Sequence, residues 1–313
     1  MGVDYKTIKR DPFDIATDRA PGSYFESLSD GHKIYYHIWK PAGEVKAQAL
    51  YFHGLGEHIE RYDENFRKYA DAGILIRSMD WRGHGRTVKS NKDGIQGYHK
   101  SFAQVFEDMV QLYSIDVDGV SKSVPTFVFG HSMGGLLALL FTKNFGSKIQ
   151  NLRGVISQSP AIKAGTPPSA PVLWAIRSLG TFLPKVTQPN ELDVAGLNSI
   201  EDNVIAYLKD PLNHGMISVQ LAKDMFDGVD EIKTGAANFK FPLIMYHNVS
   251  DRLTLSEGSR NLFPTLGSTD KKFFEFAGDL KLGHEIHNEP SVRASIISDY
   301  TAWILERSEP SSK

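Results

Sequence analysis

The chain has 313 residues, of which 41% are apolar, so it can form one large core or a core with a smaller subdomain. Its 35 basic and 37 acidic residues give a net charge of −2, and no dense run of Lys or Arg stands out. The sequence therefore lacks the basic surface by which proteins bind nucleic acid. The absence of cysteine excludes disulfides, a cysteine nucleophile and cysteine-ligated zinc.

The ends of the chain and its apolar runs bear on localisation. Residues Met1 to Lys6 contain no apolar signal-peptide core. The longest strongly apolar stretch, Met133 to Phe141, is less than half of the ~20 residues that a membrane-spanning helix needs. We therefore expect a cytoplasmic protein without a transmembrane helix.

Runs rich in β-branched and aromatic residues predict eight strands. They are residues 23–28, 33–39, 48–53, 74–80, 126–130, 152–158, 242–247 and 272–276. The first two flank Ser29-Asp30-Gly31, a turn typical of an antiparallel hairpin, whereas longer, helix-compatible segments separate the others. Because strands that alternate with helices form parallel sheets, we expect an α/β fold with an eight-stranded, mostly parallel sheet flanked by helices.

Residues 161–240 interrupt this alternation. They contain four prolines before Lys185 and several helical patterns, but no convincing core strand. We predict that this segment is an inserted cap, and that residues 1–160 and 241–313 form the core. The alternative is an ordinary run of crossover helices, although one crossover needs only about a dozen residues.

The sequence Gly130-His131-Ser132-Met133-Gly134 has the pattern G-x-S-x-G. It follows an apolar strand and precedes a good helix, and so resembles the nucleophile elbow of the α/β-hydrolase fold. The tight turn of such an elbow strains the serine backbone and leaves no room for side chains two residues to either side. We therefore predict that Ser132 is a nucleophile.

A serine hydroxyl needs a general base, and the base needs an acceptor that fixes its tautomer. In the chain order Ser, Asp, His that this fold uses, Asp251 follows one predicted strand and His284 follows the next. Both residues then lie in loops at the carboxyl edge of the sheet, which the elbow shares. His287 competes with His284 for the role of base, and Asp279 competes with Asp251 for the role of acid.

The segment His53-Gly54-Leu55-Gly56 ends the third strand, where this fold uses a backbone N–H to stabilise the oxyanion. We expect Leu55 and Met133 to donate the two N–H groups. A dinucleotide motif is excluded because Ile59 occupies the third glycine position, and His53 with His58 is too sparse for a metal site. The sequence thus implies no cofactor and no metal.

Several blocks together resemble the monoacylglycerol lipase branch of the α/β-hydrolases, over roughly residues 23–306. The blocks are His53-Gly54-Leu55-Gly56-Glu57-His58 with Arg61-Tyr62, Asp80-Trp81-Arg82-Gly83-His84-Gly85, Gly130-His131-Ser132-Met133-Gly134-Gly135 and His284-Glu285-Ile286-His287-Asn288-Glu289. Within the predicted cap, Asp210-Pro211-Leu212-Asn213-His214-Gly215 also resembles that family. The sequence departs from the family pattern in three places. Asn248 stands where Gly usually follows His247, residues 278–283 make a longer approach to His284, and Thr87 stands near where a Ser usually follows Arg-Gly-His-Gly.

The resemblance implies Ser132 as nucleophile, Asp251 as acid and His284 as base, with Leu55 and Met133 as the oxyanion hole. It further implies that three residues line the polar end of the pocket, where the family holds the glycerol moiety. These residues are Glu57, Arg61 and His287. The alternative is that they lie at the surface or only support the site.

The expected activity is hydrolysis of a monoacylglycerol to fatty acid and glycerol through an acyl-Ser132 intermediate, with the acyl chain beneath the cap. A lysophospholipase and a broad carboxylesterase are alternatives, because the same three residues serve any ester. A non-catalytic receptor or scaffold of this fold usually lacks one of them, whereas candidates for all three are present. The sequence indicates no obligate protein partner.

The predicted cap contains apolar residues at largely helical spacing, namely Val172, Leu173, Trp174, Ile176, Leu179, Phe182 and Leu183. Such a stripe usually packs on the core or, here, lines an acyl tunnel. The alternative is peripheral contact with a membrane or lipid-droplet surface through the cap, aided by Arg177 and Lys185.

Overall fold

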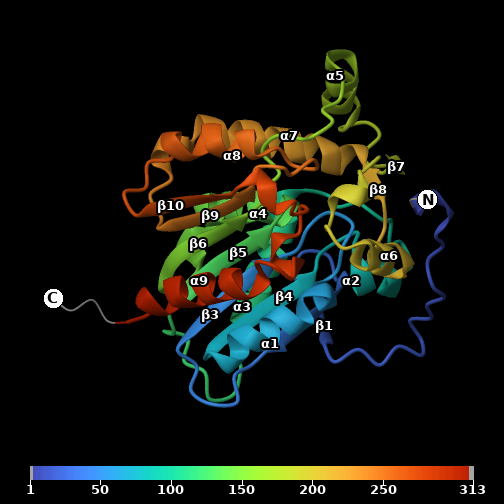
Figure 1. Ribbon diagram of the computed structural model, residues 1–313. Helices are drawn as coiled ribbons and strands as arrows, with labels where there is room; N and C mark the ends of the chain where they lie inside the picture. The colour runs from blue at the N-terminus through green and yellow to red at the C-terminus, as the bar shows by residue number, and fades with distance from the viewer. Residues whose placement is uncertain (1–2, 310–313) are drawn as a thin grey trace.

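The computed structural model describes residues 3–309, which form an eight-stranded sheet with helices on both faces (Figure 1). The strands are β1 (Ser23–Glu26), β2 (Lys33–Trp39), β3 (Ala47–Phe52), β4 (Ile74–Asp80), β5 (Thr126–His131), β6 (Leu152–Gln158), β9 (Leu243–Asn248) and β10 (Lys271–Phe276). Each predicted strand is present, and its ends lie no more than two residues from the prediction.

The strands are ordered β1-β2-β4-β3-β5-β6-β9-β10. The pairs β1–β2 and β2–β4 are antiparallel, whereas the pairs from β4 to β10 are parallel. β1 and β2 form the predicted hairpin, and Gly31 in its turn has a φ of 73°, which glycine adopts without steric cost. The prediction of a mostly parallel α/β fold is confirmed, and the carboxyl ends of β3, β5, β9 and β10 share one edge.

The helices form a layer on each face of the sheet. They are α1 (Asp63–Asp71), α2 (Gly85–Ser90), α3 (Phe102–Ser114), α4 (Met133–Phe145), α7 (Val219–Thr234), α8 (Ser256–Leu262) and α9 (Arg293–Glu306). Side chains alternate along each strand, so on β3 Leu50 and Phe52 join α3, α4 and α7 in one core, whereas Ala49 and Tyr51 join α1 and α9 in the other. Within residues 3–309, every helix is too short or too polar to span a bilayer.

The segment predicted as a cap divides into two parts. Residues 161–218 contain α5 (Ala170–Leu179), α6 (Glu201–Lys209) and an antiparallel ribbon of β7 (Thr187–Pro189) and β8 (Met216–Ser218), and α5 projects from the body (Figure 1). By contrast, α7 packs on α4: Leu221 and Ile232 lie in the core, and a Cβ on Gly228 would approach Leu140 Cδ1 to 2.7 Å. Because α7 is a crossover helix, we place the end of the proposed cap before it.

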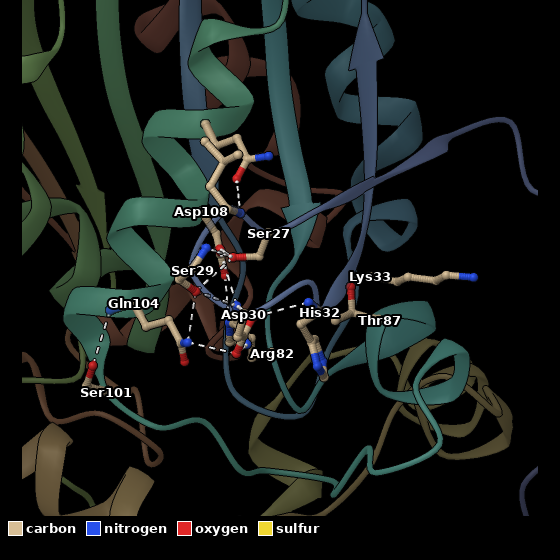
Figure 2. Close-up of polar contacts among 12 residues, drawn as sticks. Ser27, Ser29, Asp30, His32, Lys33, Arg82, Thr87, Ser101, Gln104 and Asp108 are labelled. Atoms are coloured by element: carbon tan, nitrogen blue, oxygen red, sulfur yellow. Dashed lines mark hydrogen bonds and ion pairs between the residues drawn. The ribbon is translucent and has the colours of Figure 1, made fainter.

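A polar network centred on the buried side chain of Arg82 fixes the loop that follows β4. Figure 2 shows Arg82 between two carboxylates: its Nη1 and Nη2 donate to Asp30 at 2.8 Å each, and its Nε donates to Asp108 on α3 at 2.7 Å. Gly83 in the same loop accepts a hydrogen bond of 2.8 Å from the imidazole of His214. The network therefore joins the β1–β2 turn to α3 and supports the cap through one backbone carbonyl.

Candidate active site

Ser132 lies at the turn between β5 and α4, with φ 59° and ψ −123°. This conformation is strained for a residue with a side chain, and it persists because the surrounding backbone is tightly packed. A Cβ on Gly130 would lie 2.0 Å from the carbonyl oxygen of Gly134, and a Cβ on Gly134 would lie 2.0 Å from that of Phe52. Both positions of the G-x-S-x-G pattern therefore need glycine for steric reasons.

Asp251 and His284 form a buried pair in the loops that follow β9 and β10. His284 Nδ1 lies 2.6 Å from Asp251 Oδ2, and the backbone N–H groups of Leu253 and Thr254 donate to Asp251 Oδ1 at 2.8 and 3.0 Å. Because Nδ1 donates to the carboxylate, Nε2 is left as the atom that accepts a proton. The carboxylate thus fixes the tautomer that a general base requires.

The electrostatics of the pair suit a base that becomes transiently charged. Burial by itself lowers the pKa of His284, but the charge of Asp251 and the hydrogen bond to it hold that pKa above its ordinary value. Burial raises the pKa of Asp251, and the opposing effect of His284 and His247 holds it well below its ordinary value. The carboxylate is therefore ionised and stabilises an imidazolium at His284.

His287 and Asp279, the alternative candidates for base and acid, lie in different surroundings from those of His284 and Asp251. Nδ1 of His287 is bonded to the amide of Gln158, and its ring stacks on Tyr62 at 5.0 Å between centroids. Asp279 is exposed in a short turn, Gly278–Leu280. Neither residue is paired with an acid or a base in the manner of Asp251 and His284.

His284 faces the elbow that carries Ser132. Its ring lies 4.6 Å, centroid to centroid, from that of His131, the residue before Ser132. The hydrogen bonds among residues 3–309 do not include one between Ser132 Oγ and His284, and such a contact often tightens only when substrate binds. Geometry thus brings the three predicted residues to one edge of the sheet, with the base held by the acid.

Leu55 and Met133 both present backbone N–H groups beside the elbow. Met133 is the first residue of α4, so its N–H has no partner within the helix. Among the described residues, neither this N–H nor that of Leu55 has a hydrogen-bond acceptor. The turn after Leu55 is fixed because Gly56 has a φ of 74° and its carbonyl accepts from the N–H of His214 at 2.8 Å.

Glu57 and Arg61 belong to a buried ion-pair network that includes a residue our sequence analysis did not single out. Arg61 binds Glu285 in a bidentate manner, at 2.7 Å from Nη1 and 3.0 Å from Nη2, and Nη1 also binds Glu57. The hydroxyl of Tyr62 donates to Glu57 Oε2 at 2.9 Å. Glu285 directly follows His284 in one of the quoted blocks, and an acidic residue next to the proposed base was the signal that the sequence offered.

The two carboxylates of this network have opposite pKa shifts. Burial raises the pKa of Glu57, and the charge of Arg61 offsets only part of that effect. Burial also acts on Glu285, but its paired contact with Arg61 lowers the pKa below the ordinary value. The charge of Arg61 therefore acts mainly on Glu285. Of the two carboxylates, Glu57 is the more readily protonated.

Glu57 lies beside the nucleophile. A Cβ built on Gly54 would be 2.1 Å from Glu57 Oε1 and 3.3 Å from the Cβ of Ser132. The carboxylate and the serine therefore flank the same point of the backbone, and only glycine fits between them. This places a hydrogen-bonding group within reach of a small polar substituent on an ester bound at Ser132.

Potential metal ligands do not gather here. Residues 3–309 contain no group of three or more His, Asp or Glu side chains arranged to hold a metal ion. His53, whose burial lowers its pKa to about 3, bonds through Nδ1 to the carbonyl of Gly54. Through this hydrogen bond, His53 supports the loop that carries Leu55.

Comparison with known proteins identifies relatives along most of the chain. The family model described as "Serine aminopeptidase, S33" matches residues 43–291. An uncharacterised abhydrolase domain-containing protein of Dictyostelium discoideum is 31% identical over 90% of this chain, which spans only 28% of that protein. The monoacylglycerol lipase of Mycolicibacterium smegmatis is 29% identical, covering 88% of this chain and 94% of the relative.

A solved structure gives the same result. The crystal structure of Paleococcus ferrophilus monoacylglycerol lipase superposes with a TM-score of 0.74 at 27% identity. The match covers 88% of this chain and 99% of that structure. The resemblance to monoacylglycerol lipases therefore extends from short motifs to the whole fold.

Proposed function

The chain belongs to the serine aminopeptidase, S33 family of α/β-hydrolases, and from this premise we propose that it is a monoacylglycerol lipase. It hydrolyses a monoacylglycerol to a free fatty acid and glycerol. Relatives that cover nearly the whole chain carry that name, which supports an ester substrate. The observation that carries the choice of a glycerol ester is the position of Glu57 beside Ser132, across Gly54.

The reaction proceeds in two halves. Ser132 Oγ attacks the ester carbonyl carbon while His284 Nε2 takes its proton, and Asp251 stabilises the resulting imidazolium. The N–H groups of Leu55 and Met133 stabilise the oxyanion. His284 then gives the proton to the departing glycerol oxygen, and a water molecule activated by the same base releases the fatty acid from Ser132.

The polar end of the site recognises the glycerol hydroxyls. Glu57 Oε2 is occupied by Arg61 and Tyr62, whereas Oε1 has no hydrogen-bond donor among the described residues. Nε2 of His287 is buried without a partner in the same part of the chain, while its Nδ1 is held by Gln158. Glu57 and His287 thus offer an acceptor and a donor, and Arg61 keeps Glu57 in place.

Apolar side chains on the projecting part of the cap support contact with a lipid surface. Trp174 on α5 is 71% exposed and Phe182 is 79% exposed, and Val172, Leu183 and Val186 are about half exposed. Leu173 and Ile176 are half-buried, and the side chain of Leu179 lies outside the described residues. The cap therefore docks through Trp174 and Phe182 rather than through the half-buried Leu173 and Ile176, on a helix that packs against α7.

A substrate panel tests the proposal directly. Purified protein is assayed with mono-, di- and triacylglycerols, a lysophospholipid, a fatty-acid methyl ester and an aminoacyl arylamide, with released product measured. We expect the highest kcat/KM for a monoacylglycerol. A preference for the lysophospholipid or the arylamide would contradict the proposal, and equal rates on the methyl ester would indicate a broad carboxylesterase.

A further inference from the structure

Two of the three departures from the family sequence pattern, Asn248 and the long segment 278–283, lie in contact with each other. Asn248 is the last residue of β9, and its side chain is fully buried. Its Nδ2 donates to the carbonyl of Leu282 at 2.6 Å and to that of Gly283 at 3.3 Å. The amide thus holds the end of the long segment 278–283, immediately before His284.

The same side chain also holds the loop that carries the acid. Asn248 Oδ1 accepts from the N–H of Ser250 at 3.0 Å, and the backbone carbonyl of Asn248 accepts from the N–H of Asp251 at 3.1 Å. One residue therefore bonds to the turn before Asp251 through its acceptors and to the segment before His284 through its donor. Two further hydrogen bonds join these loops near the strand ends: the N–H of Val249 donates to the carbonyl of Phe276 at 3.1 Å, and Ser250 Oγ donates to that of Gly278 at 3.5 Å. Neither of them reaches Leu282 and Gly283, the residues directly before His284.

The opposite side of Gly283 is held by a carboxylate. Glu289 is fully buried, and its Oε1 accepts from the N–H of Gly283 at 2.6 Å and from that of Ser199 in the cap at 2.7 Å. A Cβ on Gly283 would lie 2.6 Å from the backbone of Asn198, so the cap rests directly on this residue. The peptide before His284 is thus fixed from two sides, by Asn248 below and by Glu289 with the cap above.

We propose that Asn248 is a positioning residue, which sets the distance between Asp251 and His284 by bridging the two loops that carry them. The inference rests on the proposed roles of these two residues. A longer approach segment has more conformations to lose, and a bridge to the acid's own loop restricts them. Without the amide, two buried carbonyls lose their donor, and the loop relaxes away from Asp251 to satisfy them.

The test is the substitution Asn248→Ala, with a readout that a purely structural role would not change. We expect kcat/KM to fall by about 10- to 100-fold with little change in KM, because a small misplacement of a catalytic group has effects of that size. A looser contact with Asp251 lets burial lower the pKa of His284, so the acidic limb of the pH profile of kcat/KM should move to lower pH. Gln48→Ala is the matched control.

Gln48 is a buried amide at the amino end of β3, where it donates to Thr126 and accepts from Arg77. Its loss should lower thermal stability without moving the pH profile.

Asn248→Ala leaves in place every titratable group that faces His284. These groups are Asp251 and His247 on the β9 side, His131 at the elbow, Glu285 and His287 in the base's own loop, and Glu57 in the loop after β3.

The rate at which a fluorophosphonate phosphonylates Ser132, with loss of fluoride, separates this inference from the proposed substrate. Slower phosphonylation in Asn248→Ala supports the positioning role even if monoacylglycerol proves not to be the substrate. If Asn248→Ala does not fold, Asn248→Ser, whose hydroxyl is too short to bridge both loops, is measured instead with the same expectation. A folded variant with unchanged kcat/KM, phosphonylation rate and pH profile overturns the proposal.

Discussion

The imidazole of His214 in the cap donates through Nε2 to the backbone carbonyl of Gly83 in the core, at 2.8 Å. Its Nδ1 accepts from the N–H of Met216 at 3.2 Å. With one nitrogen donating and the other accepting, the ring is neutral, and burial lowers its pKa to about 4. Protonation would replace the acceptor by a second donor and break the contact with Met216.

This arrangement predicts a loss of stability in mild acid. Burial lowers the pKa of seven histidines. His32 and His37 are half-buried, and the other five are fully buried, namely His53, His84, His131, His214 and His287. The unfolded chain takes up these protons below about pH 6.5, whereas the folded chain does not, so stability present above that pH falls as the pH drops. Each fully buried histidine contributes about 1.4 kcal/mol per pH unit. His284 and the buried carboxylates Glu57, Asp80 and Asp108, whose pKa values are raised, act in the opposite direction and offset part of this loss.

The thermal unfolding midpoint between pH 8 and pH 5 measures this effect. It should be nearly constant above pH 7 and fall steeply below pH 6.5. His214→Gln removes one of the five groups and should make the acidic slope shallower. A midpoint that stays constant down to pH 5 would show that these histidines are protonated in the folded protein.

Replacement of the nucleophile is the first test of the mechanism. Ser132→Ala should lower turnover by at least ~10³-fold, as loss of such a residue does in other serine hydrolases. It should also abolish labelling by a fluorophosphonate, while circular dichroism and thermal unfolding stay close to those of the parent protein. Near-normal turnover in the folded variant would show that Ser132 is not the nucleophile.

The two histidines of the same loop should respond differently. His284→Ala removes the group that pairs with Asp251, so we expect a loss of turnover comparable to that of Ser132→Ala. His287→Ala removes a ring that bonds to Gln158, and its effect should be much milder on a methyl ester. Steady-state kinetics of both variants on that substrate decide the matter, and the reverse order would exchange their roles.

Recognition of glycerol predicts a change in selectivity. Glu57→Gln should lower kcat/KM for a monoacylglycerol by about 10-fold or more, because a hydrogen bond to a charged group contributes about 1.5–3 kcal/mol. The methyl ester of the same acyl chain lacks the free hydroxyls and should lose less. The matched control is Glu60→Gln, since Glu60 also pairs with an arginine, Arg86. Equal losses of Glu57→Gln on both substrates would mean that Glu57 only supports the fold.

Lipid docking predicts a separation between substrates on vesicles and in solution. The double substitution of Trp174 and Phe182 by Ser should weaken co-sedimentation with liposomes, because burial of each large apolar side chain contributes roughly 1.5–3 kcal/mol. Activity on vesicle-borne substrate should fall, and activity on a soluble short-chain ester should not. As a control, Leu28 and Phe274, which are also exposed but lie outside the cap, are replaced by Ser. Unchanged binding in the cap variant, or an equal loss in the control, would argue against docking through α5.

Local patterns in the sequence determined the sheet and the elbow. The strands could be predicted because β-branched and aromatic residues mark buried strands over a few residues, and helical segments between them favour parallel pairing. The glycines on either side of Ser132 could be interpreted because their steric need arises within five residues of chain. The order of Ser132, Asp251 and His284 followed from the ends of the predicted strands.

Tertiary structure decided what depends on residues far apart in the chain. Patterns alone left His284 and His287 in competition, and only packing shows which of them lies against Asp251. The pairing of Arg61 with Glu285, the assignment of α7 to the core and the bridge made by Asn248 also join distant segments. Such contacts carry no local signature, because the hydrogen-bonding partner of a buried polar group is set by where the fold places other loops, and not by its neighbours in sequence.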